Sequence, residues 1–160
     1  MDTPQAAAKA DLPAPKASAA LEAIAAAGDE ATGRFARALY AKVEDADLGQ
    51  AAPADRLGAA KALLALAANR QPGAPLIAVL NPSSAEQGWS SPHSVLLIVN
   101  DDMPFLVDSV MNELVARDIG VHLLVHPVIA VSRDASGALQ GIGGEADAGR
   151  ESMMLIEIDR

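Results

Sequence analysis

The chain lacks the residues and sequence runs on which several classes of protein depend. It has no cysteine among its 160 residues, so a disulfide framework, a thiolate metal site and a cysteine nucleophile are all excluded. No apolar stretch approaches the roughly 18 residues that a membrane-spanning helix needs. Residues 1–20 also lack the basic start and following apolar run of a secretory signal peptide.

Basic side chains are scarce relative to acidic ones. Lysine and arginine total 12 while aspartate and glutamate total 21, which gives a formal net charge of -9. An acidic surface repels the phosphates of nucleic acids and of anionic membranes. We therefore expect no nucleic-acid partner and no membrane partner, and we expect the protein to reside in the reducing cytoplasm.

The sequence also lacks the signatures of catalysis and cofactor binding. No G-x-G-x-x-G run links a strand to a helix, and no serine lies in a nucleophile elbow. His122 and His126 fall on one face of a predicted strand, about 13 Å apart at roughly 3.3 Å per residue, which is too far for one zinc ion. We therefore assign no catalytic residue, no cofactor-binding residue and no metal site.

What the sequence does contain is a strand, a helix and a second strand between Ser94 and Val131. Residues 95–99 form a continuous apolar run typical of a buried strand. Leu106, Val110 and Leu114 then repeat at helical spacing. After Gly120, apolar residues alternate with polar ones, as they do in a strand.

The rest of the chain divides into three parts. An Ala/Pro-rich leader is expected to be disordered, a helical segment follows it, and an α/β domain begins after a breaker at residues 70–74. The three parts span residues 1–15, 16–70 and 75–160, with helices predicted at 16–27, about 30–45 and 53–69, and further strands at 76–80, 139–142 and 152–158. In the loop after residue 82, Trp89 is interpreted as an anchor that covers the edge of the core.

Two segments carry a resemblance to a known family. They are Asp102-Met103-Pro104-Phe105-Leu106-Val107-Asp108-Ser109-Val110 and Gly120-Val121-His122-Leu123. Together they resemble the first half of an ACT domain, with the usual pattern D-x-P-G-L-L-x-x-[IV] and G-I-N-I. With Asn81-Pro82, Gly88-Trp89, His126-Pro127 and Glu151-Ser152-Met153-Met154, the chain is similar to the N-terminal region of the large bacterial NAD-specific glutamate dehydrogenases.

The resemblance implies a fold. It is α+β, with an N-terminal helical segment followed by a partial ferredoxin-like (ACT-like) antiparallel sheet that has one crossover helix. Only three strands of the module are present, so we expect a truncated domain from a longer polypeptide, with one sheet face poorly covered. That face would pack on another copy or on the remainder of the chain.

The resemblance also implies a function. The parent enzyme converts glutamate to 2-oxoglutarate and ammonia with NAD, and its catalytic lysine and NAD-binding fold lie outside these 160 residues. We therefore expect a catalytically silent fragment without a cofactor of its own. We rank a role in interdomain or subunit assembly first, with the remainder of the parent chain and further copies in a homo-oligomer as the partners. The alternative is an amino-acid-binding allosteric sensor domain of the same enzyme.

In an ACT domain, an amino-acid effector binds near the loop between the first strand and the first helix. Carried over by position, the candidate effector-binding residues are Asn100, Asp101, Asp102, Met103, Phe105, Leu106 and His122. We expect capping of the following helix to explain at least one of the two adjacent aspartates, and a structural hydrogen bond to explain His122. Phe105 replaces the usual glycine, and its ring is predicted to fill the pocket.

Overall fold

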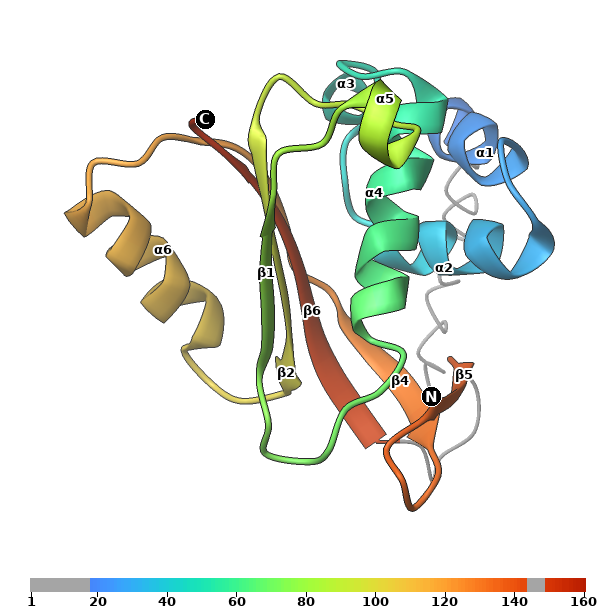
Figure 1. Ribbon diagram of the computed structural model, residues 1–160, viewed down its shortest axis with the longest axis vertical. Coiled ribbons are helices and arrows are strands. Elements are labelled where there is room, and N and C mark those ends of the chain that lie inside the picture. Colours follow the sequence, from blue (N-terminus) through green and yellow to red (C-terminus); the bar gives the residue numbers. More distant parts are fainter. Residues whose placement is uncertain (1–17, 144–148) are drawn as a thin grey trace, which may run out of the picture.

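The computed structural model describes residues 18–143 and 149–160, so the leader predicted at residues 1–15 lies outside the described residues. The elements follow one another as α1 (Ala19–Ala26), α2 (Glu30–Leu39), α3 (Asp45–Leu48), α4 (Pro53–Leu66), β1 (Leu76–Leu80), α5 (Ser84–Gln87), β2 (Ser94–Asp101), α6 (Leu106–Ala116), β3 (Val121–Val125), β4 (Val128–Arg133), β5 (Leu139–Ile142) and β6 (Gly149–Ile158). They form three layers, with α6 on one side of the sheet and α1, α2 and α4 on the other (Figure 1). The helix predicted at about 30–45 ends already at Leu39, and the short helix α3 begins only at Asp45.

The central strand of the sheet is β6. It pairs with β2 along one edge and with β3 and β4 along the other, while β1 flanks β2 and β5 flanks β4, and every pairing is antiparallel. Because β2 and β3 are both antiparallel to β6, they are parallel to each other, and α6 is the crossover between them. The predicted α+β class, an antiparallel sheet with one crossover helix, is confirmed.

A proline divides the edge that β3 and β4 form. The two strands lie end to end along β6, with Val125 opposite Leu155 and Val128 opposite Ser152. Pro127 lies between them and has no N–H for the ladder, although its carbonyl still accepts a 3.1 Å hydrogen bond from the Met153 N–H.

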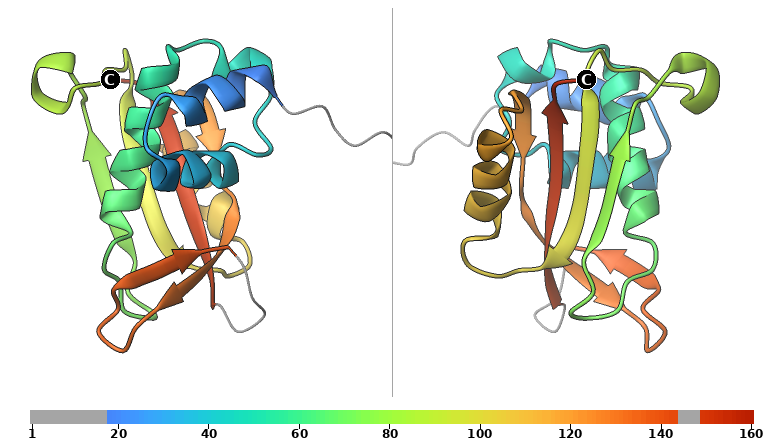
Figure 2. Two further views of the ribbon diagram at one scale, coloured as in Figure 1. Left: turned by 90° about the vertical axis from the view of Figure 1, so that its right-hand side faces the viewer. Right: turned by 60° about the vertical axis from the view of Figure 1, so that its left-hand side comes forward.

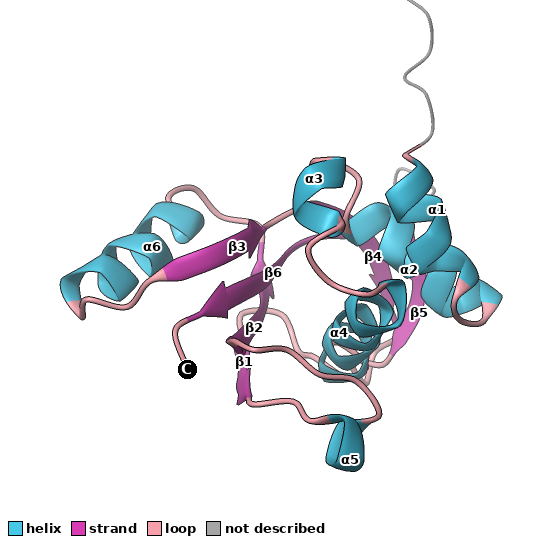
Figure 3. Cartoon of the chain, turned by 90° about the horizontal axis from the view of Figure 1, so that it is seen from above, coloured by secondary structure: helices cyan, strands magenta, loops and turns pink. Residues whose placement is uncertain are grey.

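Both faces of β6 are buried. Met153 and Leu155 belong to the core beneath the N-terminal helices, whereas Met154 and Ile156 belong to the core beneath α6, and all four are 0% exposed. This alternation follows from the two-residue period of a strand. Figure 3 shows the helical layers on opposite sides of the sheet.

The face of the sheet toward the N-terminal helices is covered, so the poorly covered face that was expected is not this one. There α4 packs on β2 and β6 through Ala60 and Leu63, which are 0% exposed, and Phe35 of α2 is equally buried. On the opposite face, α6 does not bury the side chains of β1, and Ile77 and Val79 remain 63% and 59% exposed. Coverage of this face is thus incomplete at β1.

Trp89 anchors the loop before β2 onto α4. It is 7% exposed, and the interpretation of this side chain as a core anchor is confirmed. Its ring lies directly on Gly58, where an added Cβ would approach the Trp89 Cγ to 2.2 Å. The absence of a side chain at Gly58 therefore makes room for the indole.

The Gly58→Ala variant tests this contact. Alanine is favoured over glycine inside a helix by about 0.8–1 kcal/mol, but overpacking against Trp89 costs about 1–3 kcal/mol. We expect the free energy of unfolding, measured by urea denaturation, to fall. In the control Ala65→Gly, at an exposed position of α4, propensity acts alone and costs about 0.5–1 kcal/mol. An increase in stability for Gly58→Ala would contradict the packing argument.

Candidate functional site

The predicted effector residues lie at opposite ends of the sheet. Asp101, at the end of β2, pairs with Glu151, whereas Val121, at the start of β3, pairs with Ile158. Seven residues of β6 separate these positions, or about 23 Å at roughly 3.3 Å per residue. The loop at 100–106 and His122 therefore do not form one site. In a pair of parallel strands, the end of one strand and the start of the other lie at opposite ends of the sheet.

Asp101 binds an arginine rather than the start of α6. Its carboxylate lies 2.6 Å from Nη2 of Arg70 and accepts a 2.9 Å hydrogen bond from the Gly73 N–H. Asn100 Oδ1 lies 3.5 Å from the same Nη2. The N-cap of α6 is Phe105, with no side-chain hydrogen bond at the cap. The prediction that at least one of the two aspartates caps α6 is therefore wrong, because Phe105 occupies the cap position and the buried Arg70 binds Asp101.

Phe105 adopts an unusual backbone conformation. Its φ is 64°, in the left-handed region that glycine enters freely and that costs other residues about 1–2 kcal/mol. Its carbonyl accepts hydrogen bonds from the N–H and Oγ of Ser109 at 2.9 and 2.8 Å. The ring is 77% exposed, so the prediction that it fills a pocket is wrong.

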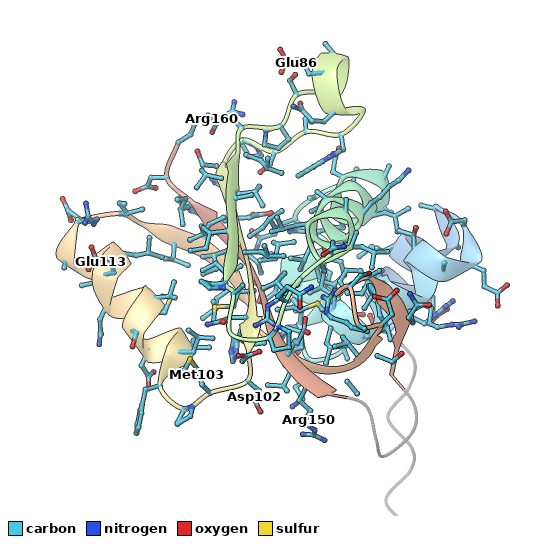
Figure 4. The ribbon with its side chains drawn as sticks, turned by 60° about the horizontal axis from the view of Figure 1, so that its bottom comes forward. Glu86, Asp102, Met103, Glu113, Arg150 and Arg160 are labelled. Atoms are coloured by element: carbon cyan, nitrogen blue, oxygen red, sulfur yellow. The ribbon has the colours of Figure 1, made fainter. Side chains whose placement is uncertain are left out.

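A small recess lies beside this loop. It has a volume of ≈ 150 Å³, and the predicted residues Asp102, Met103, Phe105 and Leu106 line it together with His126. His126, and not His122, is thus the histidine that lies near the candidate loop. Figure 4 shows Asp102 and Met103 at this end of the molecule.

His122 lies at the other end of β3 and is held in place by two neighbours. Its Nε2 is 2.7 Å from Oδ1 of Asp159, and its ring stacks on that of His93 with a centroid distance of 3.9 Å. The structural hydrogen bond predicted for His122 is thus present. The hydrogen bonds from His122 and from the Gly120 N–H hold the pKa of Asp159 below its ordinary value.

A larger cavity, of ≈ 280 Å³, opens beside His122 between the N-terminal helices and the sheet. At its wall, Nη1 of Arg56 lies 2.7 Å from Oε1 of Glu157, and these side chains are 5% and 12% exposed. Arg56 also donates to the carbonyls of Asp47 and Leu48 at 2.8 and 3.2 Å. The guanidinium is therefore neutralised and fixed.

The same cavity carries further carboxylate groups. Asp55 lines it, and one of its oxygens accepts a 2.9 Å hydrogen bond from the Ser90 N–H. With Asp47 and Glu157 there are three carboxylates against one arginine, an arrangement that favours a ligand with a protonated amino group. Our sequence reasoning missed these residues. Glu157 had a signal, as the only charged residue within the apolar run 153–158, whereas Arg56 had none.

Within residues 18–143 and 149–160, no group of three or more histidine, aspartate or glutamate side chains is placed to hold a metal ion. Over the same ranges, no helix has both the length and the hydropathy to cross a membrane. The described part of the chain thus offers a small-molecule cavity and exposed surfaces as its candidate sites.

Comparisons with known proteins identify relatives. The sequence model of the family described as "Glutamate dehydrogenase, ACT1 domain" matches residues 35–160. The NAD-specific glutamate dehydrogenases of Halomonas elongata and Pseudomonas aeruginosa are 41% and 34% identical to the chain over 130 residues, which is 79% of its length. The chain spans only 8% of the length of each relative. No solved structure matches it.

The Asp101→Asn variant tests the ion pair with Arg70. The hydrogen bond from Arg70, with a further one from Gly73, holds the pKa of Asp101 below its ordinary value. The pair therefore stabilises the fold above the unfolded-state pKa of about 3.9 and loses this effect as pH falls through the lower folded-state value. We expect Asp101→Asn to be less stable than the native chain at pH 7 and to converge with it in acid.

Urea unfolding between pH 7 and pH 3 measures this difference. Asp102→Asn is the matched control, because it removes the adjacent carboxylate and leaves the pair with Arg70 intact. A stability difference between Asp101→Asn and the native chain that persists unchanged into acid would contradict the linkage.

Proposed function

The chain belongs to the glutamate dehydrogenase ACT1 domain family, and from this premise we propose that it is a non-catalytic regulatory module of a much longer NAD-specific glutamate dehydrogenase in the cytoplasm. In this proposal, catalysis of glutamate oxidation with NAD takes place in other parts of the polypeptide. The module acts by packing against those parts, and an exposed apolar strip on β1 is the observation that carries this role.

The apolar strip consists of Ile77 and Val79. They pair with Ile98 and Leu96 of β2, which belong to the core beneath α6, so all four side chains share that face of the sheet. The two β2 residues are 6% and 9% exposed, but the strip itself is 63% and 59% exposed. In the right-hand view of Figure 2, α6 lies to one side and leaves β1 open.

Exposed branched apolar residues on an edge strand favour association with another surface. The occupant that we propose is the remainder of the parent polypeptide, because the chain amounts to only 8% of its relatives' length. Full burial of a valine or isoleucine side chain contributes about 1.5–3 kcal/mol. Two such residues, already more than half exposed, thus offer enough free energy to position a neighbouring domain.

A double variant, Ile77→Ser with Val79→Ser, tests the assembly role. We expect it to weaken binding of the 160-residue chain to the separately produced remainder of the parent enzyme by at least about tenfold, as measured by calorimetry. The fold of the isolated chain should persist, because neither side chain is buried in it.

Val115→Ser is the matched control for this experiment. Val115 is 71% exposed on α6, so the control removes an exposed apolar side chain outside the strip. Binding that is equally strong for the double variant and the native chain would overturn the assembly proposal.

A second candidate function is the binding of an amino-acid effector, and the cavity of ≈ 280 Å³ favours it. Its carboxylates Asp55 and Glu157 suit an ammonium group, and Arg56 lies beside Glu157. The cavity also joins the helical layer to the sheet, so a ligand there would bear on how the two layers pack. In this candidate function, of the residues predicted from the sequence, only His122 contacts the effector.

Calorimetric titration with glutamate, aspartate, glutamine and arginine tests this second function. One of these amino acids should bind to the native chain, and we expect Asp55→Asn to weaken its binding by about tenfold. The substitution removes a carboxylate and with it a charge-assisted hydrogen bond to the ammonium group of the ligand. The control Asp108→Asn removes a carboxylate at the recess beside Phe105. If Asp108→Asn abolished binding and Asp55→Asn did not, the effector would bind at the loop and not in the cavity.

A further inference from the structure

Two large apolar side chains project from the loop that precedes α6. Met103 is 51% exposed and Phe105 is 77% exposed, and together we call them the knob. The left-handed φ of 64° at Phe105 would cost a glycine nothing. A phenylalanine therefore strains the backbone without burying its ring in the chain. Strain together with exposure points to a contact outside the chain.

The knob has an acidic surround. Asp102 lies between β2 and the knob, and Asp108 lies in the first turn of α6; both line the recess beside Phe105. A surface that receives the knob should therefore be apolar within and basic at its rim.

The chain itself carries a surface with these properties. A groove of ≈ 570 Å³ lies between the end of α2 and the break between β3 and β4. Its apolar lining includes Leu39, Val43 and Pro127, and its cationic groups are Lys42 and Arg150. The volume is ample for an aromatic side chain, and the two cations complement the acids that flank the knob.

The knob and the groove are neighbours on the molecule. His126 and Val128 line both the groove and the recess beside Phe105. Figure 4 shows Met103, Asp102 and Arg150 at the same end of the molecule. A patch that carries a projection next to its own complementary hollow is self-complementary, which is the requirement for an isologous two-fold contact.

We propose that a second copy of this chain docks on this patch, with the Phe105 ring of each copy inserted into the groove of the other. The aspartates that flank each knob then face Lys42 and Arg150 of the other copy. This contact is separate from the apolar strip on β1. A homodimer through the knob therefore goes beyond the packing of the strip against the remainder of the parent chain.

Analytical ultracentrifugation of the 160-residue chain over a concentration series tests the proposal. We expect reversible dimerisation of the native chain, with a dissociation constant raised at least tenfold by Phe105→Gly. Glycine relieves the strained φ, so the melting temperature of the dilute variant should equal or exceed that of the native chain. A purely structural role for Phe105 predicts the reverse, a lower melting temperature.

Two further measurements locate the contact. Val115→Ser, which removes an exposed apolar residue on α6, should dimerise like the native chain, as should the double serine variant of Ile77 and Val79. Lys42→Glu should dimerise poorly alone, yet its mixture with Phe105→Gly should form a heterodimer, because one intact knob then faces one intact groove.

Three results would overturn the proposal. They are a native chain that stays monomeric up to its highest soluble concentration, a Phe105→Gly variant that dimerises as well as the native chain, and a failure of the mixture to associate better than either variant alone. The first result would mean that the knob contacts a partner other than a second copy of this chain. Loss of dimerisation in the double variant of the β1 strip would assign the contact to that strip instead.

Discussion

Two buried ion pairs join the helical layer to the central strand, and the other features of the structure depend on them. Arg56, in the first turn of α4, pairs with Glu157, and Arg70, just beyond the end of α4, pairs with Glu151. The two arginines flank most of α4, and the two glutamates are six residues apart, about 20 Å along a strand. One pair at each end of the contact holds α4 antiparallel along β6.

The pairs bracket an apolar contact. Between the two glutamates, Met153 and Leu155 face the helices and are 0% exposed. A buried carboxylate or guanidinium is costly alone, so the loss of one partner of the Arg56–Glu157 pair would leave an uncompensated charge in this interface, whereas Glu151 is also paired with Arg133 at 2.9 Å. The pairs therefore specify the register of the layers more than they add to stability. The Arg56–Glu157 pair lies at the wall of the cavity beside His122. At the other end of the contact, Arg70 also binds Asp101.

Local patterns in the sequence predicted most of the fold and little of the site. The apolar run 95–99 and the helical spacing of Leu106, Val110 and Leu114 are patterns among residues close together in the sequence. The structure has β2 and α6 at these positions. The pair of Arg56 with Glu157 joins residues 101 apart, and no local pattern reports such a contact. The separation of His122 from the loop at 100–106 was within reach of sequence reasoning, because a crossover helix already implies parallel strands.

The loop before α6 shows why a resemblance in sequence is not a resemblance in site. Phe105 stands where the family pattern has glycine, and its φ of 64° lies in the left-handed region that glycine adopts freely. Its ring points outward, and the recess beside it is about half the volume of the cavity at His122, ≈ 150 Å³ against ≈ 280 Å³. The loop therefore presents an exposed apolar side chain at this position. Such a loop is better suited to contact a protein surface than to enclose an amino acid.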